Sequence, residues 1–256
     1  MPAWLIVPAA IAAALFLLPL IGLLTAAPWS KMWSLVSDDA TLDALLLSLE
    51  CSLASAGLCL LLGLPLATWL SQGNDALRTT VRVFTTIPMV LPPIVGGLAL
   101  LLVYGKNHLI GGSLHRWFGI EIPFSAAGVV LATTYVAMPF FVLTVEAGLR
   151  GFDRRYAEAA ATLGAGPWHT FRTITLPTIA PSVRAGLLIA WARAIGEFGA
   201  TITFAGSFQG QTRTMPLAVY HTFESQPAAA IALSLILLAV SATVLFCLRR
   251  QWFPAK

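Results

Sequence analysis

The sequence predicts an all-α, polytopic membrane protein with six transmembrane helices. Of its 256 residues, 58% are hydrophobic and only 10% are charged, and the mean hydropathy is +0.83. Because a soluble domain carries roughly 25% charged residues, this composition indicates that lipid surrounds much of the folded chain. A helix needs about 20 apolar residues to cross the hydrocarbon core, and six segments meet that requirement.

The six predicted spans alternate with short polar segments and make up one transmembrane domain, 1–256. They lie at 4–26, 42–70, 83–104, 125–149, 183–205 and 228–248. Three cysteines, Cys51, Cys59 and Cys247, fall inside these spans. They lack the spacing of a metal site, so we interpret them as small buried hydrophobic residues.

The first span has an alternative interpretation as a cleaved signal peptide, because LTAA at 24–27 resembles a cleavage site. Two features favour a retained helix. No Lys or Arg precedes Leu5, and the apolar run is longer than the hydrophobic region of a usual signal peptide. We therefore expect the first span to remain in the mature protein.

The basic residues predict the orientation. With the N-terminus in the cytoplasm, ten basic residues lie inside and four outside, as the positive-inside rule describes. The inner ones are Arg78, Arg82, Arg150, Arg154, Arg155, Arg172, Arg184, Arg249, Arg250 and Lys256; the outer ones are Lys31, Lys106, Arg116 and Arg213. Both termini and the segment 150–182 are then cytoplasmic.

The segment 150–182 is predicted to form two short helices joined at a glycine corner. Asp153 caps a helix that starts at the next residue, and Gly164 ends it after an alanine-rich stretch. Pro167 suits the first turn of a second helix, which we expect to end at Leu176-Pro177. A membrane protein has little use for such an insert unless a partner docks on it.

The first of these helices carries a face of small residues. Ala157, Ala160, Ala161 and Gly164 form this face and permit close approach of another surface, while Glu158 and the neighbouring arginines, Arg155 among them, offer charged contacts at its edge. The alternative is an amphipathic helix lying on the lipid surface. The shortage of large apolar residues argues against it.

The insert resembles the cytoplasmic EAA loop of ABC-transporter permeases. The family pattern is Glu-Ala-Ala, three residues, Gly, nine residues, Ile, one residue and Leu-Pro. This chain has Glu158-Ala159-Ala160, Gly164, Ile174 and Leu176-Pro177 at that spacing. The resemblance covers nearly the whole chain and implies the type I ABC importer permease fold. It also implies that 158–164 is a coupling helix seated in a groove of a separate ATPase.

The sequence lacks the Gly-x-x-x-x-Gly-Lys-Ser/Thr phosphate loop that an ATPase needs, since the run 164–166 has no following lysine. We therefore expect a transport subunit that is not itself an enzyme. No cofactor is expected on this chain; ATP and Mg are expected on the partner ATPase.

The fifth predicted span contains two opposite charges, Arg193 and Glu197. Their i,i+4 spacing allows them to pair on one helix face, which lowers the cost of burying each charge in lipid. Two interpretations stay open: a pair that only neutralises itself, or a polar element that lines or gates a pathway. Glu197 repels an anion, so Arg193 contacts one only where Glu197 does not fully neutralise it.

Small and hydroxylated residues surround this pair. Gly196 and Gly199 permit close crossing of helices, within one chain or between two copies. Thr201 and Thr203 have hydroxyls that suit an oxyanion, although threonines in membrane helices more often bond to their own helix.

Two prolines mark the third predicted span. Pro92 and Pro93 interrupt the helical ladder, and Gly96-Gly97 allows close packing beside them. A broken helix at membrane depth is tolerated only where protein or a cavity covers it. The segment is thus a candidate pathway wall, with a kink needed only for packing as the alternative.

Several runs are similar to the molybdate branch of the permeases: GEFGAT at 196–201, QTRTMPLAVY at 211–220 and MVLPPIVGG at 89–97. Sulfate permeases share the GEFG core but differ downstream, and tungstate permeases match more loosely. The resemblance therefore implies an oxyanion substrate, molybdate first, with sulfate or thiosulfate and tungstate as alternatives.

The resemblance further implies an assembly in the inner membrane of a bacterium or archaeon. It consists of two copies of this chain, a cytoplasmic ABC ATPase dimer and an extracytoplasmic oxyanion-binding protein. The binding protein is expected to land on the outer loops 105–124 and 206–226. Alternating access then moves the substrate.

Other functional classes find little support. The four histidines and the acidic residues are scattered, so neither a metal site nor a membrane-embedded enzyme is indicated. The internal repeat of many ion-coupled transporters is not visible, and no basic face suggests nucleic acid. Glu146 and Arg150 are expected to pair near the end of the fourth span, and Glu50 to lie near the outer interface.

Overall fold

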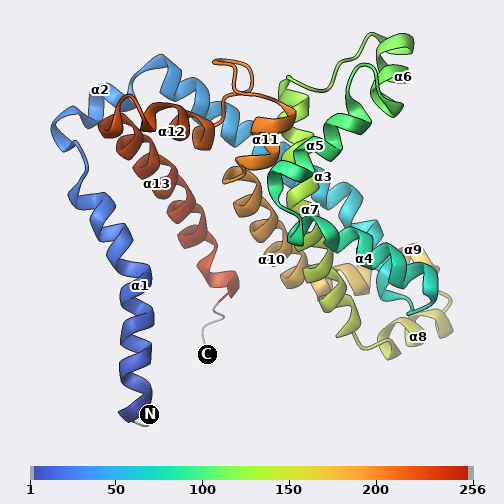
Figure 1. Cartoon of the computed structure of the whole chain (residues 1–256). Helices are drawn as coiled ribbons and strands as arrows, with labels where there is room; N and C mark the ends of the chain where they lie inside the picture. Colours follow the sequence, from blue (N-terminus) through green and yellow to red (C-terminus); the bar gives the residue numbers. More distant parts are fainter. Residues whose placement is uncertain (1–2, 253–256) are drawn as a thin grey trace.

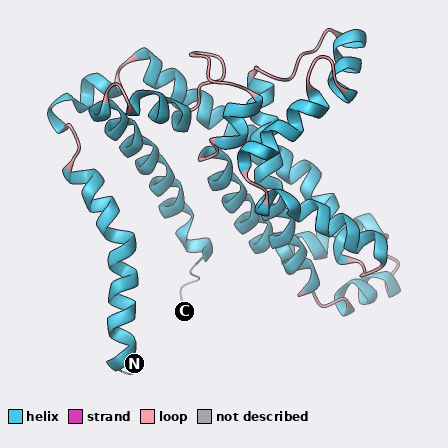
Figure 2. Ribbon diagram, viewed as in Figure 1, coloured by secondary structure: helices cyan, strands magenta, loops and turns pink. Residues whose placement is uncertain are grey.

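The computed structural model is all-α, which confirms the predicted fold class (Figure 2). It describes residues 3–252, and within this range all side chains except those of residues 3, 245 and 247–252. The side chains of Cys247, Arg249 and Arg250, and all of Lys256, lie outside the described residues. Cys51 and Cys59 are free and buried, as predicted.

The helices follow one another with short connections (Figure 1). They are α1 (Ile6–Thr25), α2 (Met32–Val36), α3 (Asp39–Ser71), α4 (Ala76–Val90), α5 (Pro93–Tyr104), α6 (Leu109–Phe118), α7 (Ala126–Arg150), α8 (Arg155–Thr162), α9 (Pro167–Thr170), the π-helical turn η3 (Phe171–Thr175), α10 (Leu176–Ile195), α11 (Gly199–Phe204), α12 (Met215–Phe223) and α13 (Pro227–Trp252).

Five helical segments of the described chain are long and apolar enough to cross a membrane. They are α1, α3, α7, α13 and the continuous helix Pro167–Ile195; a sixth results if α5 and α6, bent by 46°, form one span. Figure 1 shows α2, α6 and α12 at one end of the molecule and α8 at the other, where α1 also begins. We call these the upper end and the insert end.

The core lies where α3, α7 and α10 pack together. The buried Phe141 ring of α7 sits between two glycines: an ideal Cβ would lie 2.6 Å from the ring at Gly63 of α3 and 3.2 Å from it at Gly186 of α10. Apolar side chains of the three helices close around the ring. Small residues therefore let three long helices approach one aromatic ring.

The helix α1 lies apart from this core. None of its residues is buried, and its main neighbours are the short 3₁₀ turn η1 (Ala3–Leu5) and α13. Figure 1 shows it at the edge of the molecule, separate from the other long helices. Its apolar surface is therefore free for lipid or for another protein chain.

Two predicted spans are not single helices. The interruption at Pro92 and Pro93 was predicted and is confirmed, whereas the prediction of an unbroken fifth span was wrong. The segment 83–104 is divided between α4 and α5, because Pro92 and Pro93 supply no N–H to continue the ladder. The segment 183–205 is divided after Ile195, and α11 begins at Gly199. The prolines reveal the first break, whereas apolar composition runs through the second and does not reveal it.

The predicted helix end at Leu176-Pro177 is also wrong. The chain stays helical from α9 through η3 into α10. The wider π-helical turn lies directly before Leu176, so that Pro177, which has no N–H to donate, falls in the first turn of α10. The insert is thereby joined to α10 without a flexible link.

Substitution of the core glycine tests this packing. Gly63→Ala places a methyl group against Phe141, and we expect a loss of about 1–3 kcal/mol in unfolding free energy. Thermal unfolding of the purified protein in detergent measures the effect.

Gly57→Ala is the matched control on the same helix, because no atom lies within 4 Å of a Cβ at Gly57. It should leave the unfolding temperature unchanged or raise it. Equal destabilisation by the two substitutions would contradict the packing described above.

Candidate functional site

The two helix breaks meet in space. An ideal Cβ on Gly199 would lie 2.8 Å from Cβ of Pro93, and one on Gly97 would lie 2.7 Å from the carbonyl oxygen of Ala200 and 2.8 Å from Cβ of Thr203. Real Cβ atoms do not come so close to other heavy atoms. The crossing of α5 and α11 therefore depends on glycine at both positions, as predicted for Gly199 and Gly97.

Glu197 holds the break between α10 and α11. Its Oε2 lies 2.6 Å from Nη1 of Arg193, and its Oε1 accepts a hydrogen bond of 2.8 Å from the backbone N–H of Ala200. The predicted ion pair is confirmed, but the two residues do not share a helix face, because α10 ends before Glu197. The second role of Glu197, as the cap of α11, was not predicted.

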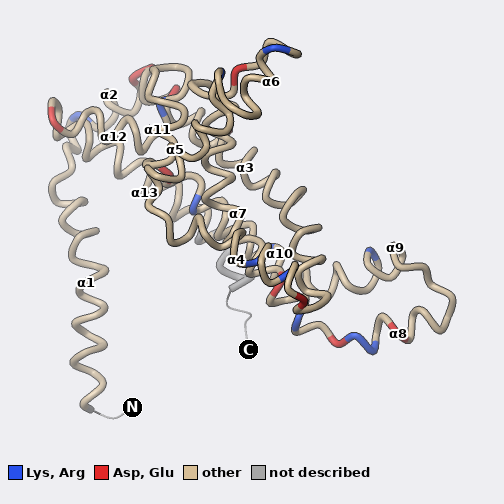
Figure 3. Tube along the Cα trace, turned by 45° about the vertical axis from the view of Figure 1, so that its right-hand side comes forward, with Lys and Arg blue, Asp and Glu red and all other residues tan. Residues whose placement is uncertain are grey.

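The ion pair is unevenly buried. The side chain of Glu197 is 1% exposed and that of Arg193 is 30% exposed. Charged residues otherwise gather toward the two ends of the molecule, with few between (Figure 3). A carboxylate this close neutralises much of the Arg193 charge, so the geometry favours a positioning role over direct anion binding in this arrangement.

Several backbone groups at both breaks have local hydrogen-bond partners. The carbonyl oxygen of Pro92 accepts hydrogen bonds from the N–H groups of Val95 and Gly96. The N–H of Glu197 donates to the carbonyl of Ala194, and that of Ile202 to the carbonyl of Phe198. This explains how two breaks are tolerated among apolar helices.

The two threonines of α11 differ. Thr203 donates its hydroxyl to the carbonyl of Gly199 at 2.9 Å, the commoner behaviour in membrane helices. Thr201 is fully buried, and its Oγ1 has no hydrogen-bond partner among the described residues. Gly196 is exposed, and only a carbonyl of its own helix comes within 4 Å of a Cβ there, so the predicted close crossing does not occur at Gly196 in this chain.

An aromatic pair beside the break was not predicted. The rings of Phe198 and Tyr220 lie 5.0 Å apart and connect the break to α12. Phe198 borders an apolar hollow of about 410 Å³, which residues of α12 and α13 also line. Because aromatic residues are common in apolar spans, the sequence alone did not single these two out.

The first helix of the insert, α8, begins at Arg155, one residue later than predicted, and Asp153 caps its start as predicted. Asp153 Oδ1 accepts the backbone N–H of Arg155 at 3.0 Å, and the Asp153 and Arg155 side chains pair at 2.6 Å. Hydrogen bonds from Arg155 lower the pKa of the Asp153 carboxyl, and the carboxylate raises the pKa of Arg155. Gly164 has φ +85°, a left-handed conformation that suits glycine at the corner after α8.

The face that α8 leaves free is larger and more apolar than predicted. Ala160 is only 8% exposed, so part of the predicted small-residue face is already covered within the chain. Tyr156, Leu163 and Trp168 are instead exposed, Leu163 to 89%. Glu158 and Ala159 are exposed beside them. We call Tyr156, Glu158, Ala159, Leu163 and Trp168 the insert face.

A buried carboxylate lies where the insert joins the bundle. Glu146 of α7 pairs with Arg150, as predicted, at 2.9 Å. It also pairs with Arg82 of α4 at 2.8 Å, which was not predicted. We call these three residues the Glu146 cluster. Arg82 and Glu146 are 64 positions apart, so sequence spacing does not predict the contact. An arginine beside an apolar run, with no acidic residue near it, was a hint.

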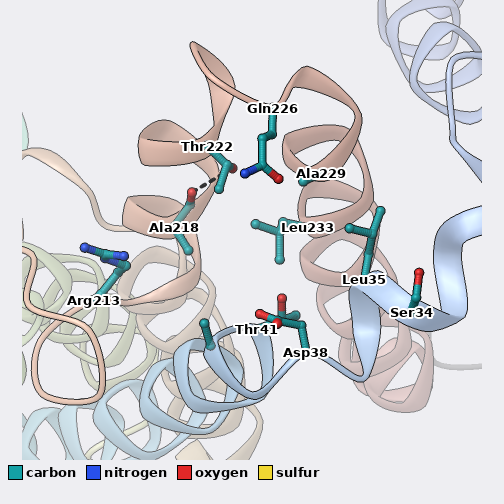
Figure 4. A pocket seen from close by; sticks show the side chains of 11 residues that line it. Ser34, Leu35, Asp38, Thr41, Arg213, Ala218, Thr222, Gln226, Ala229 and Leu233 are labelled. Atoms are coloured by element: carbon teal, nitrogen blue, oxygen red, sulfur yellow. Dashed lines mark hydrogen bonds between the residues drawn. The ribbon is translucent and has the colours of Figure 1, made fainter.

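The upper end carries a small polar hollow (Figure 4). About 310 Å³ in volume, it lies between the start of α3, α12 and the start of α13, and both Asp38 and Arg213 line it. Near α6, Glu121 pairs with Lys106 at 2.6 Å, and Nδ1 of His115 lies 3.2 Å from the same carboxylate oxygen. The hydrogen bond from Lys106 lowers the pKa of Glu121. No group of three or more potential metal ligands occurs among the described residues.

Sequence relatives agree with this architecture. Residues 60–250 match the family described as "Binding-protein-dependent transport system inner membrane component". The chain is 43% identical over 244 residues to "Molybdenum transport system permease protein ModB" of Mycobacterium tuberculosis, covering 95% of this chain and 92% of that protein. It is 36% identical over 218 residues to the Escherichia coli K12 protein of the same name, covering 85% and 95%.

Solved structures share the fold. A chain of a bacterial ABC transporter that imports alginate aligns with a TM-score of 0.70 at 19% identity, covering 96% of this chain and 93% of that one. A chain of the MetNI methionine ABC transporter aligns with a TM-score of 0.64 at 19% identity, covering 86% and 95%. With the match over 60–250, the chain belongs to the family of binding-protein-dependent transport system inner membrane components.

Proposed function

We propose that the chain is the permease subunit of an ATP-driven importer of molybdate. The observation that carries this proposal is 43% identity, over 95% of the chain, to a molybdenum transport system permease. The GEFGAT and MVLPPIVGG runs lie where α10–α11 and α4–α5 break. Sulfate or thiosulfate and tungstate are the alternative oxyanions.

The proposed assembly has two copies of this chain, an ABC ATPase dimer that uses ATP and Mg, and an extracytoplasmic binding protein. The exposed apolar surface of α1 supports a second copy as a neighbour, alongside lipid. The insert and both termini are assigned to the cytoplasm on the basis of the charge bias. The loops 105–124 and 206–226 then receive the binding protein at the upper end.

The insert is proposed as the coupling element. The insert face offers the ATPase two aromatic rings and an exposed leucine, with a carboxylate beside them. Arg155, Ala160 and Gly164 support this face by shaping α8 and its corner. Leu176 and Pro177 lie at the junction of η3 and α10, so their proposed role is to pass movement onward.

The crossing of the two breaks is proposed as the gate. Pro92 and Pro93 contribute one break, and Gly196 and Glu197 contribute the other. Gly199 and Thr203 line the contact with α5, and Thr201 is buried within α11. Movement of α11 away from α5 opens the crossing during alternating access. Arg193 contributes by holding Glu197.

Coupling through the insert is tested at its glycine corner. Gly164→Val forces a branched side chain into the left-handed region, at a cost of about 1–2 kcal/mol. We expect ATP hydrolysis by the assembled complex to lose its stimulation by the loaded binding protein, and uptake to fall. Proteoliposome uptake and ATPase assays measure both.

Gly166→Val is the control for Gly164→Val, because Gly166 has an ordinary φ of −70° and no atom lies within 4 Å of a Cβ there. Unchanged stimulation and uptake in Gly164→Val would refute the proposed role of the corner.

The ion pair at the break is tested by charge reversal. Arg193→Glu and Glu197→Arg should each abolish most uptake, because each leaves a buried like-charge pair. The double reversal restores attraction but not the cap, since arginine has no acceptor for the Ala200 N–H. We therefore expect partial recovery in uptake, with an interaction energy of about 1 kcal/mol or more in the double-mutant cycle.

A double variant no better than either single variant would refute direct pairing. Glu197→Gln separates the two roles, because its amide oxygen keeps an acceptor for Ala200 while the charge is lost. It should retain more uptake than Glu197→Ala.

The substrate is tested by competition. Uptake of radiolabelled molybdate by the complete complex should be competed strongly by tungstate, which has the same charge and shape and nearly the same size. Sulfate is smaller and should compete weakly. Competition chiefly by sulfate would favour a sulfate importer instead.

A further inference from the structure

The Glu146 cluster joins two helices that are far apart in sequence. Oε1 of Glu146 accepts hydrogen bonds from Nε of Arg82 at 2.9 Å and from Nε of Arg150 at 3.0 Å. The Arg150 contact stays within α7, whereas the Arg82 contact crosses from α4 to α7. Glu146 is 3% exposed, whereas the side chains of Arg82 and Arg150 are 22% and 42% exposed, so the carboxylate is buried and the Arg82 contact is the better shielded of the two.

The arginines of α4 also hold the end of α3. Arg82 Nη2 donates to the carbonyl of Leu70 at 3.0 Å, and Arg78 Nε donates to the carbonyl of Trp69 at 3.0 Å. These carbonyls belong to the last turn of α3, where cationic side chains stabilise a helix end; the carbonyl of Trp69 also accepts the N–H of Gln72. Hydrogen bonds from Arg78 and Arg82 of α4 therefore connect α4 to the end of α3 and to the end of α7.

The cluster lies between the insert and the break at Pro92. α7 ends at Arg150, and the insert follows after Gly151. α4 carries Arg82 near its middle and ends at Val90, directly before the break. If the insert end of α7 shifts and the cluster stays intact, α4 moves with it, because a buried charge pair is costly to separate.

The insert is also connected to the bundle through its C-terminal side, and this connection does not depend on the Glu146 cluster. α9 continues through η3 into α10, which ends at the other break. The insert thus reaches one break through a continuous helix and the other only through side chains. The two breaks touch where Gly199 meets Pro93, so the state of the crossing depends on the positions of both α10 and α4.

We propose that Arg82 and Glu146 are positioning residues that transmit the movement of the insert to α4, and through α4 to the gate. This proposal rests on the proposed function, because it assumes that the insert is driven by an ATPase. Arg150 has a different role. Its side chain is 42% exposed, its bond to Glu146 lies within one helix, and its second bond, from Nη2 to Oδ1 of Asn74 at 2.9 Å, ends in the loop before α4, so neither bond reaches α4 itself.

The experiment compares Arg82→Gln with Arg150→Gln in the complete complex in proteoliposomes. Each substitution removes one positive charge and one partner of the same oxygen. We expect both complexes to assemble and hydrolyse ATP. Molybdate transported per ATP hydrolysed should fall about tenfold in Arg82→Gln, within the usual range of coupling between sites, and about twofold or less in Arg150→Gln.

A second readout follows the gate directly. An environment-sensitive fluorophore on Val90→Cys, at the exposed end of α4, should respond to ATP in the parent complex and in Arg150→Gln. It should not respond in Arg82→Gln. A role confined to stability would change the amount of assembled complex without abolishing this response.

A charge swap covers the case in which Arg82→Gln does not assemble. Glu146→Arg combined with Arg82→Glu keeps an attractive contact between α4 and α7, so transport per ATP should recover relative to either single reversal. Equal loss in Arg82→Gln and Arg150→Gln, normal coupling in Arg82→Gln, or no recovery in the swap would overturn the proposal. Failure of the parent complex to transport molybdate would count against the proposed function instead.

Discussion

Two helices are interrupted within the apolar part of this protein, and hydrocarbon offers no hydrogen bonds to the backbone groups that an interruption frees. The structure meets this constraint by placing the two breaks against each other. The prolines at 92 and 93 remove two donors outright, and Glu197 supplies an acceptor for α11. The contact between Pro93 and Gly199 then excludes other atoms from the crossing. The positions of α5 and α11 follow from this arrangement.

Glu197 shows how one side chain meets two demands. Its carboxylate needs a positive partner because it is buried, and the start of α11 needs an acceptor because its first N–H groups have no helical partners. One oxygen serves Arg193 and the other serves Ala200. A glutamine preserves the second function only, and an aspartate is one methylene shorter. The requirement for glutamate here therefore arises from geometry as well as from charge.

Local features of this fold were predictable, and distant contacts were not. The residues of the pairs Arg193–Glu197 and Glu146–Arg150 are four positions apart, so their spacing predicts the contacts. The corner at Gly164 was predictable because glycine readily adopts the left-handed conformation that ends a helix. The break after Ile195 was missed because the apolar pattern continues through it. Arg82 was missed because a contact between α4 and α7 depends on tertiary packing. The helix end expected at Pro177 was wrong because the preceding π-helical turn lets the helix continue.

The insert is attached to the bundle unequally, and this asymmetry has a mechanical consequence. On its N-terminal side, Gly151 and the turn before α8 separate it from α7, so α8 can tilt without bending α7. On its C-terminal side, no non-helical residue separates α9 from α10. A push on the insert therefore reaches Glu197 along a stiff helix. The same push reaches Pro92 only if α7 and α4 stay in contact and move together.

A loose contact between α4 and α7 would change what happens where the two breaks touch. α11 would then slide over Gly97 without moving α5. Buried ionic contacts at Glu146 oppose such slack better than apolar packing does, since they have a defined distance and direction.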